Sequence, residues 1–168
     1  MRHRFPSAIA ACLLLAAPLQ AAEIGLRPEQ IGEIFCLSRT GNDMAPAEAL
    51  LTAPLAGAIA AAWARNDAWA AGNPGDKPPL GDGIPWQAWP DYASECRPGL
   101  VTLMRSDARV EIAYAFSDAP EAGFVDTLVL RRVALDTRFG GEGWRIDNVL
   151  HATGDDLRSA LEESFAGL

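Results

Sequence analysis

The stretch VEIAYAFS, residues 110–117, decides the fold class of this 168-residue chain. Its larger apolar side chains alternate with small or polar ones, and the apolar set is Val110, Ile112, Tyr114 and Phe116. A period of two residues is the pattern of a β-strand that buries one face. The segment therefore predicts a strand on one side of a hydrophobic core.

Three more strands are predicted around this one. Residues 101–105 form a strand that can pair with it through the turn at Ser106. Residues 124–135 form a longer run that is apolar on both sides in its middle, as expected of a central strand. A last strand follows the turn at Gly140, and its alternating apolar residues are Trp144, Ile146 and Leu150.

Helical periodicity predicts helices in the first half of the chain and at its end. One helix runs from Pro28 to about Gly41, and a short one covers residues 47–51. Thr52 can cap a longer helix that reaches about residue 71, with an inner stripe of Leu55, Ile59, Ala62, Trp63 and Asn66. Thr153 and Asp156 have capping-box spacing before a closing helix, whose inner residues are Leu157, Ala160, Leu161, Ser164 and Phe165.

These elements predict an α+β fold. We expect a curved antiparallel sheet of about four strands, covered on one face by the N-terminal helices, with a short C-terminal helix. Residues 72–100, with six prolines and five glycines, are expected to form a long loop. The loop also carries Trp86, Trp89 and Tyr92, aromatic residues that either plug a core or rim a pocket.

The N-terminus has the pattern of a secretory signal peptide. Arg2 and Arg4 precede an apolar run over residues 8–19, and small residues follow, so we expect cleavage after Ala21. An alternative is lipid attachment at Cys12, which follows Ile9, Ala10 and Ala11. The remaining residues 22–168 fit a single domain, and none of their apolar runs is long enough to span a membrane.

The net charge limits the classes of partner that the protein can bind, and the cysteine content indicates its compartment. Without residues 1–21 the chain keeps 12 of its 14 basic residues and all 22 acidic ones, a net charge of −10 that argues against nucleic acid and anionic membranes. Cys36 and Cys96 then remain as an even pair, which predicts one disulfide in the periplasm or outside the cell; two buried free thiols are the alternative. Since His151 is the only histidine left and no Cys-x-x-Cys pair occurs, we expect no metal and no cofactor.

Three segments carry a resemblance to a known family. They are GIPWQAWPDY (83–92), the strand over 110–116, and GWRIDNV (143–149) followed by LRSAL (157–161). From about Ile31 onward the chain resembles the bacterial exported family catalogued as domain of unknown function 3828. The element order is similar to the wider nuclear transport factor 2-like superfamily. This resemblance implies a conical fold with a pocket between helices and sheet, and no particular activity.

Few residues are candidates for chemistry. Asp126 shares a strand face with Phe124, Leu128 and Leu130, and burial there would raise the pKa of its carboxyl toward that of a general acid or base. Because charged groups are seldom buried without a partner, the sequence favours a solvated Asp126 instead. Asp91, Tyr92 and His151 can meet at the rim of the cone, or they are respectively a turn residue, a cover of the core and an exposed histidine.

The sequence thus favours a binding or protein-interaction module of the cell envelope. The binding surface would be the loop around Trp86, Trp89 and Tyr92 or the mouth of the cone, and the partner an envelope protein or a small apolar ligand. The alternative is an isomerase- or hydrolase-like enzyme that uses Asp126 or Asp91 as its base. Nucleophile-elbow, P-loop and calcium-loop motifs do not occur in the chain.

Overall fold

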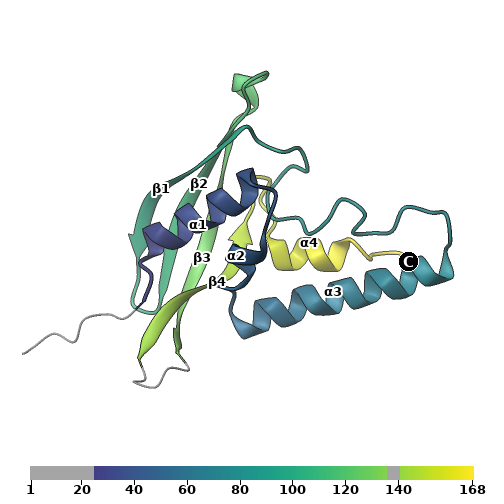
Figure 1. The fold of residues 1–168 in the computed structure, drawn as a ribbon, viewed down its shortest axis with the longest axis horizontal. Coiled ribbons are helices and arrows are strands. Elements are labelled where there is room, and N and C mark those ends of the chain that lie inside the picture. The colour runs from purple at the N-terminus through teal and green to yellow at the C-terminus, as the bar shows by residue number, and fades with distance from the viewer. Residues whose placement is uncertain (1–24, 136–140) are drawn as a thin grey trace, which may run out of the picture.

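The chain folds as an antiparallel four-stranded sheet with helices packed beside it (Figure 1). The computed structural model describes residues 25–135 and 141–168. The expected signal segment, Cys12 and Gly140 lie outside those residues. In the described part the strands follow the order β1-β2-β3-β4, which confirms the predicted α+β class and the antiparallel sheet.

The three C-terminal strands lie close to their predicted positions, although in the last one the pairing shifts register, so that Val149 is fully buried and the predicted inner residue Leu150 only partly. They are β2 (Asp107–Ala115), β3 (Phe124–Ala134) and β4 (Glu142–Leu150). In β2 every second side chain is buried, and the buried set is Val110, Ile112 and Tyr114 together with Ala108. The strands of a sheet that buries one face alternate in this way.

The first strand is longer than predicted. β1 spans Glu95–Leu103, so the loop before it ends at residue 94 and the expected loop over 72–100 is too long. The pairing of β1 with β2 shifts register between Pro98 and Val101. Pro98 hid the strand in the sequence, yet an edge strand tolerates a proline and a bulge because one side of it is unpaired.

The first helix, α1 (Pro28–Thr40), lies across β1 and β2 (Figure 1). Gly32 permits this close packing, since a Cβ there would come within 2.9 Å of Pro98 Cβ and 3.0 Å of Val110 Cγ1. The predicted disulfide joins Cys36 of α1 to Cys96 of β1, with their Cα atoms 5.1 Å apart. The bridge therefore fixes α1 on the edge of the sheet.

The short helix lies earlier than predicted. α2 spans Ala45–Glu48, because the carboxylate of Asp43 accepts a hydrogen bond from the Ala45 N–H at the start of the helix. The expected helix residues Leu50 and Leu51 instead run along β4. There the Ile146 N–H donates to Leu50 O, and the Thr52 N–H donates to Ile146 O, both at 2.8 Å. This short segment covers part of the edge of β4.

The long helix α3 (Ala53–Gly72) extends away from the sheet, and the following loop returns beside it (Figure 1). Thr52 caps it as predicted, since the Leu55 N–H donates to Thr52 Oγ1. The predicted inner stripe is confirmed apart from Trp63, which is 38% exposed. Asn66 in that stripe accepts the Leu80 N–H at 2.9 Å, which ties the returning loop to the helix.

The closing helix α4 (Leu157–Glu163) packs against α3 and β4. Its N-cap is Asp156, whose carboxylate accepts the N–H groups of Arg158 and Ser159. The prediction of Thr153 as the cap is wrong, because the Thr153 hydroxyl donates to Asp155 instead. The cap therefore lies three residues further along the chain than the sequence suggested.

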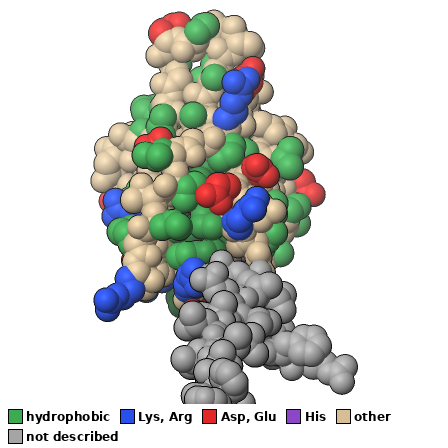
Figure 2. Space-filling model, turned by 90° about the vertical axis from the view of Figure 1, so that its left-hand side faces the viewer, with side chains coloured by type: hydrophobic (Ala, Val, Ile, Leu, Met, Phe, Trp, Pro, Cys, Tyr) green, Lys and Arg blue, Asp and Glu red, His purple; other side chains and the backbone are tan. Residues whose placement is uncertain are grey.

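The sheet turns its other face away from the core. Along β3, Val125 and Val129 alternate with buried residues, so this face carries apolar side chains as well as small and polar ones. Figure 2 views the molecule from the side of the sheet, where hydrophobic side chains gather in the middle and charged side chains lie both directly beside them and at the margins. Within residues 25–135 and 141–168, no helix has the length and hydropathy needed to cross a bilayer.

Replacing both Cys36 and Cys96 by serine is expected to lower the free energy of unfolding by about 4 kcal/mol, because the bridge spans 60 residues and restricts the unfolded chain. Urea unfolding of the oxidised protein and of the double variant measures the difference. Intact masses with and without reductant check that the wild-type protein is bridged. Equal unfolding free energies would contradict the expectation.

Candidate functional site

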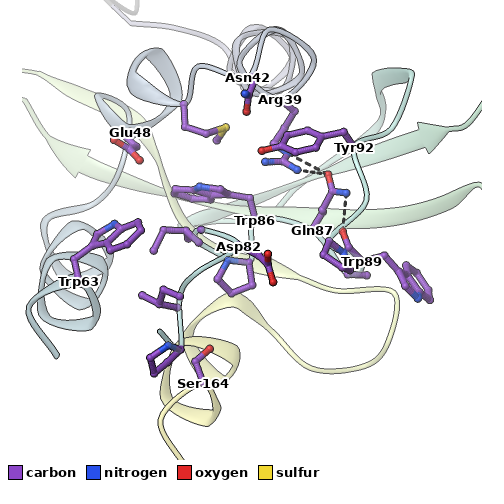
Figure 3. Close-up of a pocket in the computed structure, with 18 residues that line it drawn as sticks. Arg39, Asn42, Glu48, Trp63, Asp82, Trp86, Gln87, Trp89, Tyr92 and Ser164 are labelled. Atoms are coloured by element: carbon purple, nitrogen blue, oxygen red, sulfur yellow. Dashed lines mark hydrogen bonds between the residues drawn. The ribbon is translucent and has the colours of Figure 1, made fainter. Parts of the chain in front are cut away.

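A cavity of about 360 Å³ lies between the helices and the loop that follows α3 (Figure 3). Arg39 of α1, Glu48 of α2 and Trp63 of α3 line it, and Ser164 after α4 closes one side. Residues 79–90 and Tyr92 form most of the remaining wall. No described residue of the four strands lines this cavity, so it lies between helices and loop and is not the pocket between helices and sheet that the resemblance implied.

Gln87 holds the loop in shape. Its amide nitrogen donates to the carbonyls of Trp89 (2.7 Å) and Asp91 (2.6 Å), and its Oε1 accepts from Arg39. Gln87 is 5% exposed, so the amide that makes these bonds is itself buried. Gln87 was not singled out from the sequence, because a glutamine in a loop carries no signal of its bonds to two nearby carbonyls and to Arg39, 48 residues away.

The aromatic residues of the loop divide into a plug and a rim. Trp86 is buried and meets Phe35 edge-on, with ring centroids 6.3 Å apart. Trp89 is 44% exposed and Tyr92 61% exposed, so both belong to the rim. In Figure 3, Trp86 lies between Trp63 on one side and Arg39 with Tyr92 on the other, while Trp89 points away. Both roles considered for these aromatic residues therefore occur.

Arg39 is the basic side chain of the cavity wall. Its Nε and Nη2 donate to the same Gln87 oxygen, at 3.1 and 2.5 Å, and its guanidinium lies 5.5 Å from the centre of the Tyr92 ring. Among the described residues, no carboxylate forms an ion pair with it. Sequence reasoning missed Arg39, since only the fold brings the end of α1 against the loop.

Asp126 points inward, so the interpretation of a solvated Asp126 is wrong. The residue is 1% exposed, and its two carboxylate oxygens accept the N–H groups of Ala88 (3.1 Å) and Ala152 (2.9 Å). Burial raises the pKa of this carboxyl, while the two backbone donors and the charge of His151 partly oppose the shift. Asp126 is not among the residues that line the cavity. Its oxygens hold the loop and the β4–α4 connection to β3.

His151 is buried, so the prediction of an exposed histidine is also wrong. Its Nε2 lies 3.1 Å from the carbonyl oxygen of Pro85, and its Nδ1 lies 3.3 Å from a carboxylate oxygen of Asp155. The Thr153 hydroxyl hydrogen bond is the main cause that lowers the pKa of Asp155. The imidazole therefore links the loop to the turn before α4.

The predicted rim cluster of Asp91, Tyr92 and His151 forms only in part. Asp91 and Tyr92 line a second, neighbouring depression together with Trp89, Phe116 and Phe124. His151 lies outside that lining and on the Pro85 side of the loop. The two acidic groups proposed as bases, Asp91 and Asp126, therefore lie in separate environments.

Tyr114 lies beneath the rim, with its ring 4.7 Å from Phe124. Burial raises the pKa of its hydroxyl above the usual range, the charge of Asp126 adds to the shift, and Arg39 opposes it. Among the described residues the hydroxyl forms no well-aligned hydrogen bond, but the Arg39 guanidinium lies close enough to interact with it. A neutral phenol is therefore the form that this position holds.

Within the described ranges, no group of three or more His, Cys, Asp or Glu side chains could hold a metal ion. Comparison of the chain with models of known families, with curated proteins and with solved structures found no match.

Asp126 is expected to make the fold less stable as pH rises. The folded pKa of its carboxyl is raised above the ordinary 3.8, so the folded protein keeps a proton that the unfolded chain has released. Its favourable contribution is therefore complete below pH 3.8 and is lost as pH rises through the folded pKa.

The variant Asp126→Asn isolates this effect. The amide can accept one of the two backbone N–H groups but not both, at a pH-independent cost of about 1–3 kcal/mol. The unfolding free energies of both proteins are measured from about pH 4 to 7. As pH rises, the unfolding free energy of the wild type should fall relative to that of the variant. A constant difference across that range would contradict the raised pKa.

Proposed function

We propose that this protein is an extracytoplasmic binding module that holds a small, largely apolar ligand in the cavity beside Trp63 and Trp86. The observation that carries the proposal is the cavity itself. Its volume of about 360 Å³ lies within the range of about 300–1,000 Å³ of small-molecule sites. Aromatic walls and a few placed polar groups are typical of such sites.

The way the wall is held supports binding. Gln87, Asp126 and Asn66 each hydrogen-bond the backbone of the loop, so the wall is ordered before a ligand arrives. A site that is already ordered loses less conformational entropy on binding. The same contacts occupy both oxygens of Asp126, which favours a structural use of that carboxylate over general-base catalysis.

The compartment belongs to the same proposal. Export to the periplasm, with cleavage after Ala21, is supported by the N-terminal pattern and is compatible with the Cys36–Cys96 disulfide. The resemblance to the domain of unknown function 3828 family and to the nuclear transport factor 2-like cone is supported by the helices beside an antiparallel sheet.

Trp63→Ala is expected to weaken binding of neutral aromatic probes about tenfold, because the indole supplies an open part of the wall. Indole and 4-phenylbutanamide are suitable probes, and NMR titration gives their dissociation constants. Trp69→Ala is the matched control, since Trp69 belongs to the same helix but not to the cavity wall. Absence of binding by the wild type, or equal losses in both variants, would contradict the proposal.

The exposure of Trp89 and Tyr92 favours a second candidate function, docking of another envelope protein on this loop. Exposed aromatic residues are enriched at protein interfaces. Tagged wild type should then capture one partner from its envelope extract in near-equal amount, and Trp89→Ala should lose it. Recovery of the protein alone, or the same partner with Trp89→Ala, would contradict docking through this loop.

A further inference from the structure

We propose that the ligand of the Trp63–Trp86 cavity carries a single carboxylate, and that Arg39 is the residue that binds it. This inference rests on the proposed ligand-binding function and adds the chemical class of the ligand. It comes from one feature of the wall, a half-buried guanidinium whose partners are all neutral.

The hydrogen-bond inventory of Arg39 leaves donors for a ligand. A guanidinium has five N–H groups. The hydrogen bonds to Gln87 Oε1 use one on Nε and one on Nη2, and the Tyr114 hydroxyl, which also interacts with Arg39, takes at most one more. The end of the fork formed by Nη1 and Nη2 keeps N–H groups that match the two oxygens of a carboxylate. Gln87 and the Tyr92 ring hold the plane of the fork, so its direction is set before a ligand binds.

The charge balance points to an anion. A partly buried charge without a counter-ion is costly, and the ion-pair contacts of the described residues give Arg39 none. The other charged groups of the wall are acidic. Asp82 is already paired with Lys77 at 2.5 Å, and Glu48 lies on the far side of Trp86 from Arg39 in Figure 3. One guanidinium balances one negative charge, and the carboxylate of Glu48 on the same wall disfavours a second, as a dianion such as phosphate would bring.

The neighbours of Arg39 define the rest of the ligand. Met44, Leu80, Ile84 and Trp86 line the same hollow, and Trp63 closes the end opposite Arg39 (Figure 3). Such a wall suits an aryl or alkyl body, which would lie along Trp86 with its carboxylate toward the fork. The chemical class is therefore an aryl- or alkyl-carboxylate monoanion.

The test uses matched pairs of probes on the unaltered protein. Phenylacetate, 4-phenylbutanoate and octanoate are each titrated beside their primary amides, which keep the body and remove the charge. We expect the best-bound acid to bind at least about tenfold more tightly than its amide, as a charge-assisted bidentate contact implies. In Arg39→Met the preference for the acid should disappear, while the amide keeps its affinity.

Arg97→Met, an exposed arginine outside the cavity wall, is the matched control and should keep the preference. If Arg39→Met disorders the loop, the comparison of acid with amide on the wild type still tests whether the cavity prefers a carboxylate. Equal affinities of acid and amide would overturn the carboxylate and leave the binding function standing. Binding of no acid, no amide and no indole would overturn both, and an acid preference that survives in Arg39→Met would overturn the role of Arg39.

Discussion

The buried carboxylate of Asp126 makes the contact on which the wall of the cavity depends, although Asp126 itself does not line it. It stands on β3 and accepts two backbone N–H groups, from Ala88 in the long loop and from Ala152 before α4. Burial of a charged carboxylate is unfavourable, and the raised pKa of this group is the sign of that cost. The two hydrogen bonds join three segments that are remote in sequence, namely β3, the long loop and the connection before α4, at one point on the inner face of the sheet.

The loop over residues 73–94 has no helix or strand of its own, so side chains must satisfy its backbone. Asn66 accepts the Leu80 N–H, Asp126 accepts the Ala88 N–H, and Gln87 donates to two carbonyls further along. Each of these three polar side chains is buried. Buried side chains therefore hold the loop on the side that faces the protein. Its other side can expose Trp89 and Tyr92 to solvent.

The sequence predicted what depends on local periodicity and missed what depends on distant backbone groups. Alternation placed β2, β3 and β4, and an even cysteine pair indicated the bridge. Asp126 was interpreted as solvated because no side chain nearby could pair with it. Its real partners are backbone N–H groups 38 and 26 residues away, which no letter of the sequence marks. Arg39 was missed for the same reason, since its partner Gln87 is 48 residues away.

The disulfide links the compartment of the protein to the chemistry of its cavity. Cys36 and Arg39 are three residues apart on α1, so they are neighbours on one side of that helix. Cys96 holds this part of the helix against β1, and Gly32 lets the backbone approach closely. The position of the Arg39 fork relative to Gln87 is thus set from both ends, by a covalent bond on one side and by the ordered loop on the other. An oxidising compartment favours the bridge, and with it the geometry in which the guanidinium faces the cavity.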